Sequence, residues 1–172
     1  MHGSNSGLAH GTAGSPQQTL GQETYKAKAQ AAEAALAREN FLRKELVKSC
    51  PMKVPKNAGI NPLQKKGYKQ VKYTWSRGKY RYEARWHTRT PGAPKEQGTT
   101  WVITRRIPGI GYGPQARLAV KHVYVGNAQR KGHWVTWERW QAAISANKNG
   151  KATKKQKEML ENGHWPAGDK VL

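Results

Sequence analysis

Two neighbouring runs of alternating side chains constrain the fold of this chain more than any other feature of its sequence. In residues 71–75 apolar and aromatic residues alternate with polar ones, and in residues 80–87 aromatic or small residues alternate with charged residues and a histidine. A period of two is typical of a half-buried β-strand. Arg77-Gly78, between the two runs, indicates a turn. We therefore predict a β-hairpin whose aromatic face points inward and whose charged face points outward.

Other patterns predict two more strands and an N-terminal helix. Strands are expected over residues 101–106 and 118–125. Residues 23–48 consist largely of Ala, Lys, Glu, Leu and Arg, which favour a helix. Because proline restricts the residue before it, the helix should end ahead of Pro51.

Two short C-terminal helices are predicted from their capping residues. Thr136 can cap a helix that ends at Asn149-Gly150, and Thr153 with Gln156 matches a capping box for a second helix that stops at Gly163. The fold class is therefore α+β: an N-terminal helix, an antiparallel sheet of about four strands with a basic open face, and a C-terminal helical hairpin. The expected segments are a flexible leader (1–22), a spacer helix (23–50), a connector (51–66), the α+β domain (67–166) and a tail (167–172).

The chain is strongly basic, and its charge is unevenly distributed. The 31 Lys and Arg outnumber the 10 Asp and Glu, and between Lys65 and Gly132 there are 16 basic residues against two acidic ones, Glu83 and Glu96. So basic a sheet should bind a polyanion, with nucleic acid as the first candidate. No apolar run approaches the roughly 18 residues of a membrane helix, so no stable membrane insertion is expected. The single Cys50 cannot form an internal disulfide.

One strand of the hairpin carries side chains suited to RNA cleavage without a metal. Glu83, Arg85 and His87 should share one face because alternate residues of a strand do. Such cleavage needs a base for the ribose 2′-hydroxyl, an acid for the leaving 5′-oxygen and a cation for the charged phosphorane. We predict His87 as the general acid or base, Glu83 as its partner and Arg85 as a phosphate stabiliser. The structural alternative is that Glu83 only pairs with basic neighbours and His87 lies at a strand end.

The following strands could complete this site. Either Arg105 or Arg106 should lie on the face of His87 as a second phosphate stabiliser, and alternation alone leaves open which one. His122 alternates in step with the apolar Leu118 and Val120, so catalysis and a half-buried structural role are both open for it. His133 and His164 are interpreted as packing or capping residues. No His or Cys spacing suits a metal, and neither a metal nor a cofactor is predicted. The residues predicted to bind nucleic acid are Lys72, Arg81, Trp86, Arg89, Arg106 and Lys121.

Four short motifs, taken in order, resemble a known toxin family. They are Arg85–Pro94, Thr100–Ile103, Trp140–Ile144 and Leu160–Trp165. Over about residues 65–166 they are similar to the C-terminal domains named polymorphic toxin type 30, regarded as ribonucleases of the barnase–EndoU–colicin–RelE group. The resemblance implies a ribonuclease toxin used in interbacterial competition. It would be exported by delivery machinery as part of a larger polypeptide, act in the cytoplasm of the target cell, and be neutralised in the producer by an acidic cognate immunity protein.

The sequence therefore predicts a metal-independent endoribonuclease that cleaves RNA by transesterification, with tRNA as one candidate target. The alternative from another functional class is a non-enzymatic nucleic-acid-binding protein, in which the sheet holds phosphates and the C-terminal hairpin acts as a helix-turn-helix. A metal-dependent nuclease is disfavoured because the chain lacks clustered carboxylates.

Overall fold

The computed structural model describes residues 3, 16–127, 129 and 131–168, and the chain divides into two compact units. The first unit, residues 1–41, contains helix α1 (Pro16–Asn40), whose side chains are exposed throughout residues 19–40. No helix in the described part of the chain is long and apolar enough to cross a membrane.

The first helix begins earlier than its composition predicts. It starts at Pro16 rather than at Glu23, so residues 16–22 are helical instead of belonging to a flexible leader. Proline is favoured in the first turn because its missing N–H would have no intrahelical acceptor there. Apart from Gly3, the rest of the expected leader lies outside the described residues, as do residues 169–172 of the expected tail.

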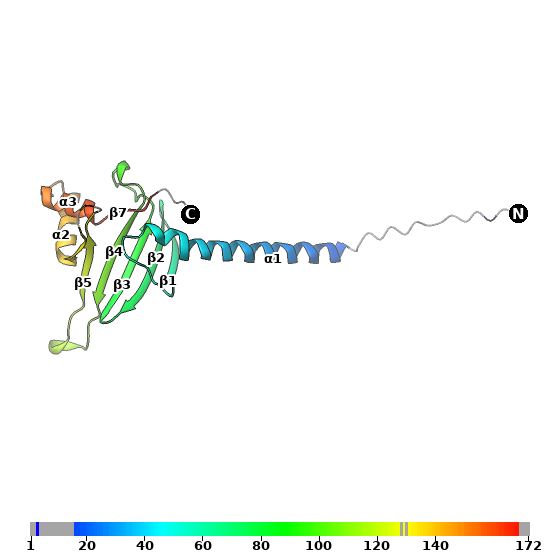
Figure 1. The fold of residues 1–172 in the computed structure, drawn as a ribbon, viewed down its shortest axis with the longest axis horizontal. Coiled ribbons are helices and arrows are strands. Elements are labelled where there is room, and N and C mark those ends of the chain that lie inside the picture. Colours follow the sequence, from blue (N-terminus) through cyan, green and yellow to red (C-terminus); the bar gives the residue numbers. More distant parts are fainter. Residues whose placement is uncertain (1–2, 4–15, 128, 130, 169–172) are drawn as a thin grey trace. The chain divides into compact units, whose positions relative to one another are not determined.

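The second unit, residues 42–172, is built on an antiparallel sheet of seven strands (Figure 1). Six strands lie side by side in chain order, and the seventh pairs with the fourth. The α+β class and the central hairpin are confirmed, whereas the expected number of about four strands was too low. The strands are β1 (Gly59–Lys65), β2 (Tyr68–Arg77), β3 (Tyr80–His87), β4 (Thr100–Ile107), β5 (Val120–Val125), β6 (His133–Thr136) and β7 (Trp165–Pro166).

The strands that the pattern does not reveal are β1, β6 and β7. Strand β1 lies inside residues 51–66, which were expected to be an irregular connector, and it contains Pro62. Proline is tolerated there because β1 pairs only with β2 and is an edge strand. Strands β6 and β7 have four and two residues, too few to show a clear alternation.

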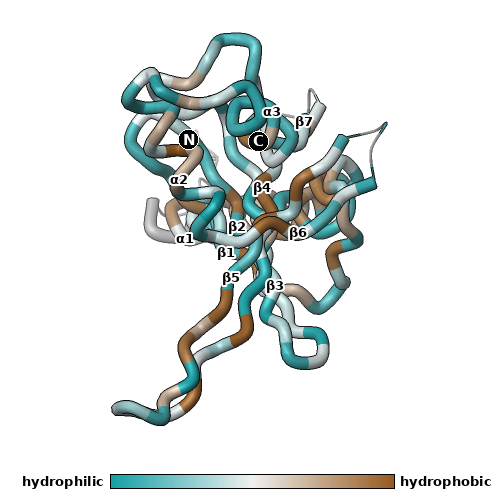
Figure 2. Tube along the Cα trace, turned by 90° about the vertical axis from the view of Figure 1, so that its left-hand side faces the viewer, coloured by the Kyte–Doolittle hydropathy of each residue, from teal (hydrophilic) through white to brown (hydrophobic). Residues whose placement is uncertain are grey.

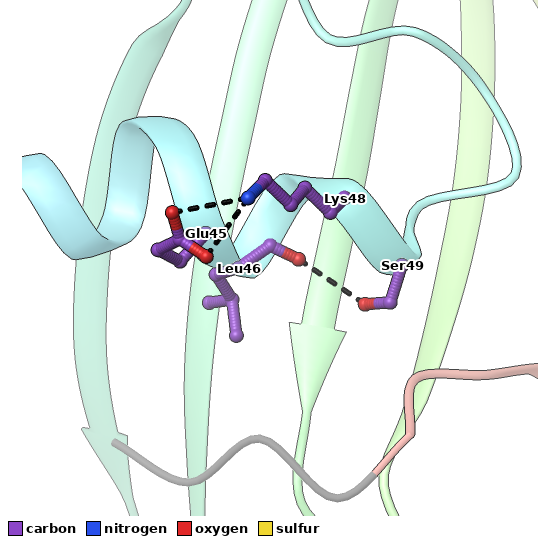
Figure 3. A network of polar contacts seen from close by, with 4 residues as sticks. All are labelled: Glu45, Leu46, Lys48 and Ser49. Atoms are coloured by element: carbon purple, nitrogen blue, oxygen red, sulfur yellow. Dashed lines mark hydrogen bonds and ion pairs between the residues drawn. The ribbon is translucent and has the colours of Figure 1, made fainter.

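The first face of the sheet, here called the η face, is covered in part by two short helices. They are η1 (Phe41–Glu45) and η2 (Leu46–Ser49), and η2 crosses in front of the strands (Figure 3). Within them Lys48 Nζ lies 3.1 Å from both carboxylate oxygens of Glu45, and the Ser49 hydroxyl donates to Leu46 O over 3.1 Å.

Because this segment packs against the sheet, the compact unit starts earlier in the chain than the expected boundary at residue 67. Leu46 is completely buried. Tyr73 donates its hydroxyl proton to Leu42 O over 2.6 Å, and Trp101 Nε1 donates to Ser49 Oγ over 2.9 Å. The unit therefore begins at Leu42, and a boundary at residue 67 would remove part of its core.

The second face, here called the α face, is covered in part by helices α2 (Trp137–Lys148) and α3 (Lys154–Asn162). Their predicted caps are confirmed, since Thr136 Oγ1 accepts from the backbone of Arg139 and Thr153 forms a capping box with Gln156. The core between helices and sheet is apolar and comes mainly from the last strands. Its members are Val102, Val123, Val125, Val135 and Trp140, with Trp137, Ile144, Met159 and Leu160 packed around them.

The connection between β4 and β5 extends beyond the sheet as a narrow arm, whose apolar stretches are brown in Figure 2. Ile110 and Arg117 exchange two backbone hydrogen bonds of 2.8 Å across this arm. Its large apolar side chains are exposed, and Tyr112 is fully so. The arm continues from the ends of β4 and β5 that carry Arg106 and Lys121.

Candidate functional site

The cross-strand register places the predicted catalytic strand residues on the α face. Glu83, Arg85 and His87 alternate along β3 with the buried Ala84 and Trp86, so they share this face as predicted. Strand spacing sets Glu83 and His87 roughly 13 Å apart, about four strand residues. Glu83 is therefore no direct partner of His87, and the face contains two distinct groups of side chains.

His87 is held in one tautomer at the end of β3. Only 7% of its surface is exposed. Its Nδ1 lies 3.0 Å from the carbonyl oxygen of Thr88, and since a carbonyl can only accept, Nδ1 carries a proton. Its Nε2 lies 3.3 Å from the Thr100 hydroxyl on β4. Burial lowers the pKa of His87, as do the nearby His164 and Arg85, while the bond to Thr88 opposes the shift.

The structure brings a second histidine to this position. The rings of His87 and His164 meet edge to face, with centroids 6.3 Å apart. His164 Nδ1 donates to Leu160 O at the end of α3, and burial lowers the pKa of His164 as well. Just before it, a side chain at Gly163 would collide with the Trp140 ring, so glycine permits the close approach that directs His164 toward the sheet.

The sequence interpretation of His164 as a packing or capping residue misses this pairing. No periodicity signals it, because His164 lies between a helix and the two-residue strand β7. The only sequence signal is that His87 and His164 both belong to the motifs that carry the family resemblance. Tyr68 on β2 is a second unpredicted neighbour, with its ring centroid 6.4 Å from that of His87.

A cluster of cations surrounds Glu83 on the same face. Lys72 Nζ lies 3.8 Å and Arg85 Nε 3.5 Å from its carboxylate. The Arg85 Nε is buried and forms no hydrogen bond of acceptable geometry, so this contact is a charge contact only. Arg85 lies between Glu83 and His87 along β3, and its charge helps to lower the pKa values of both His87 and His164.

Lys121 and Arg106 complete this cluster. They pair in register on β5 and β4, and Arg106 in turn pairs with Arg81 on β3. Lys121 Nζ lies 3.8 Å from the centroid of the Trp137 ring on α2. Burial lowers the pKa of Lys121, Glu83 opposes that shift, and the surrounding cations reinforce it. The name "phosphate cluster" is used below for Lys72, Arg81, Glu83, Arg85, Arg106 and Lys121.

Register also settles which of the two adjacent arginines shares the face of His87. Arg106 does, whereas Arg105 pairs with Tyr82 and His122 on the η face. Arg105 and His122 are therefore excluded from the predicted catalytic group, because successive residues of a strand point to opposite faces.

Two other predicted nucleic-acid contacts lie outside this cluster. Trp86 is completely buried on the η face, so no base can stack on it. Arg89 lies in the loop after β3, where its Nε donates to Ala93 O over 2.9 Å, and its side chain is exposed.

Within the described residues, no three His, Cys, Asp or Glu side chains lie close enough together to hold a metal ion. Comparison of the chain with protein-family models, with curated proteins and with solved structures finds no match.

Proposed function

We propose that the α face of the sheet binds RNA and cleaves it by metal-independent transesterification. The observation that carries this proposal is the His87–His164 pair, which lies beside Arg85 on a strongly basic strand surface. Two neighbouring imidazoles can supply both proton transfers of the reaction, and the cations can stabilise the charge that develops on phosphorus.

The hydrogen bonds of the two histidines restrict proton transfer to one ring nitrogen of each side chain. Both Nδ1 atoms donate to carbonyl oxygens, so proton transfer would use Nε2, which in His87 also contacts the Thr100 hydroxyl. A neutral Nε2 takes the proton of the ribose 2′-hydroxyl, and the resulting oxygen attacks phosphorus. The P–O5′ bond breaks, the other imidazolium donates its proton to the leaving 5′-oxygen, and a 2′,3′-cyclic phosphate remains.

The lowered pKa values of His87 and His164 suit the base in this scheme. Burial keeps the imidazoles neutral near pH 7, so a proton acceptor is available. The acid needs a protonated partner, and a bound phosphate anion raises the pKa of a nearby imidazole, so substrate binding itself favours the required charge.

The phosphate cluster supplies electrostatic stabilisation. The charge of Arg85 acts on both histidines, while Arg106 and Lys121 extend the positive surface along the face toward the β4–β5 arm. In this scheme Glu83 is a positioning residue that holds Lys72 and Arg85, rather than a proton-transfer partner of His87.

The biological setting proposed for this activity is that of a delivered toxin. The motifs that resemble polymorphic toxin type 30 contribute both histidines, which supports a toxin domain acting on RNA in the cytoplasm of a target cell. An acidic immunity protein is the partner that suits a chain with a net charge of +21, because complementary charge speeds association.

The test is cleavage of total cellular RNA in EDTA, followed by analysis of the fragment ends. We expect 2′,3′-cyclic phosphates, and no cleavage of DNA, because DNA lacks the 2′-hydroxyl. His87→Asn and His164→Asn keep a donor near the Nδ1 position but remove Nε2, and each should lower the cleavage rate by roughly 10²- to 10⁴-fold.

The matched control is His133→Asn, because His133 is exposed and lies outside the pair. Its cleavage rate should equal that of the unchanged chain. Intact RNA in EDTA, despite tight binding, would instead assign the face to a non-enzymatic nucleic-acid-binding protein.

A further inference from the structure

The η face carries a second group of side chains that the cleavage chemistry does not use. One row of residues in register crosses five strands, from β2 to β6, and its first four members are half-buried. The row consists of Trp75, Tyr82, Arg105, His122 and Thr136.

Arg105 is the centre of this row. Its guanidinium carbon lies 4.1 Å from the centroid of the Tyr80 ring and 4.2 Å from that of Trp134. The guanidinium therefore lies over two aromatic rings, which leaves its N–H groups to bind a further group. We use the name "Arg105 cluster" for Trp75, Tyr80, Tyr82, Arg105, His122 and Trp134.

Two nitrogen atoms of the Arg105 cluster lack hydrogen-bond partners among the described residues. Arg105 Nε and His122 Nδ1 are both buried, and the two residues are direct cross-strand neighbours. A buried donor without an acceptor costs free energy. The described residues therefore leave this edge of the Arg105 guanidinium without an acceptor.

Two aromatic rings beside Arg105 are stacked on each other. Trp75 and Tyr82 have an interplanar angle of 6° and centroids 5.5 Å apart. On the side away from Tyr82, no strand residue pairs with Trp75, because the ladder with β1 ends where Gly59 meets Thr74. Trp75 is half-buried, so part of its side chain is accessible to a planar group of a ligand.

The charge of the surroundings favours an anionic ligand. Arg77 and Lys79 are exposed near the β2–β3 turn, and Lys79 Nζ lies 5.5 Å from the Tyr80 ring centroid. The only acidic residue in the seven strands, Glu83, is on the opposite face, and the charge of Glu138 at the start of α2 affects His122 less than that of Arg105 does. A ligand that combines anionic oxygens with stackable planes is single-stranded nucleic acid.

We propose that the Arg105 cluster is a second RNA-binding surface, which holds an unpaired segment of the RNA on the face opposite the cleavage site. One phosphate or base oxygen would accept from the terminal N–H groups of the Arg105 guanidinium, and a base would stack on Trp75. The inference rests on the proposed function only in taking RNA as the ligand, since the two surfaces lie on opposite faces of the sheet.

The experiment measures binding rather than cleavage. The probe is a fluorescently labelled single-stranded RNA of about 12 nucleotides with 2′-O-methyl groups throughout, which cannot undergo transesterification. Fluorescence anisotropy gives its Kd for the full chain and for Arg105→Gln. We expect a Kd at least about fivefold higher for the variant, and a smaller change with the same sequence as a duplex, whose bases are already stacked.

Arg106→Gln is the matched comparison, because it removes the same group one residue away on the opposite face. If the two surfaces bind independently, the Arg105→Gln effect on Kd should be the same with and without Arg106→Gln. Tyr80→Leu removes one of the two aromatic rings that contact the Arg105 guanidinium. It is the second variant if circular dichroism melting shows that Arg105→Gln does not fold.

Unchanged Kd values for single-stranded RNA in folded variants would overturn the proposal, and the cluster would then suit an acidic protein surface. An equal rise in Kd for the duplex and for the single-stranded RNA would overturn it too, because that result would show that Arg105 contributes only its charge. Because the probe cannot be cleaved, a chain that fails to cut RNA in EDTA can still show the Arg105 effect, so failure of the proposed function is recognised separately.

Discussion

The imidazole rings of His87 and His164 stand edge to face with centroids 6.3 Å apart, although one lies on β3 and the other follows α3. Each ring donates from Nδ1 to a backbone carbonyl, that of Thr88 for His87 and that of Leu160 for His164. A buried and a half-buried histidine, each with its Nδ1 proton on a carbonyl oxygen, therefore lie side by side, and burial disfavours the charged form of both.

The first prediction concerns stability at low pH. The pKa values of His87 and His164 are lower in the folded chain than their ordinary value of 6.5, chiefly because of burial. The unfolded chain then binds more protons than the folded chain as the pH falls below about 6.5, so the free energy of unfolding should decrease there. Urea titrations between pH 7.5 and pH 5, roughly the histidine range, measure this.

In the double variant His87→Asn/His164→Asn the loss of stability over this pH range should be smaller than in the unchanged chain. His133→Asn should not alter it, since His133 is exposed. An equally steep pH dependence in the double variant would place the responsible groups elsewhere.

The second prediction separates the two roles considered for Glu83. As a positioning residue it holds Lys72 and Arg85, so Glu83→Gln should lower kcat on RNA roughly tenfold while RNA binds more tightly, because a negative charge leaves a basic face. Glu96→Gln is the matched control because Glu96 is exposed, and it should change neither kcat nor the affinity for RNA. If kcat fell as much as in His87→Asn while the affinity for RNA stayed the same, Glu83 would instead take part in proton transfer.

The third prediction concerns the segment before the sheet. Leu46 is fully buried, so Leu46→Ala should lower the free energy of unfolding by about 2–5 kcal/mol. Leu36 on α1 is 61% exposed, and Leu36→Ala should change it by less than about 0.5 kcal/mol. Chemical denaturation measures both, and equal effects would contradict the packing of η2 on the sheet.

The fourth prediction uses fragments. A chain that starts at Leu42 retains Leu46, the Ser49–Trp101 hydrogen bond and β1, and should unfold cooperatively with a midpoint close to that of the full chain. A chain that starts at Gly67 lacks all three and should not unfold cooperatively. Far-ultraviolet circular dichroism during heating distinguishes the two, and a cooperatively folded shorter fragment would restore the boundary expected from composition.

Much of the fold follows from local sequence rules. Strict alternation identified the β2–β3 hairpin and placed Glu83, Arg85 and His87 on one face, and the two threonine caps located α2 and α3. These features depend on residues close together in the chain, which is why they can be read without a structure. Strand β1 could not, because its proline is acceptable only at a sheet edge.

The site was harder to predict because it depends on register and on distant contacts. Whether Arg105 or Arg106 faces His87 is decided by how β4 pairs with β3, and a shift by one residue would exchange them. His164 reaches His87 only through the packing of α3 on the sheet and the close approach at Gly163. No local pattern contains that information, so the sequence alone does not predict the pair.

The chain order of the sheet has a consequence for translation. A nascent chain that has left the ribosome only as far as α2 already contains β1 to β6, each able to pair with the strand made just before it. It contains neither His164 nor β7. If folding follows synthesis, the proposed histidine pair forms only after His164 has emerged, so the proposed site is incomplete while most of the domain is being made.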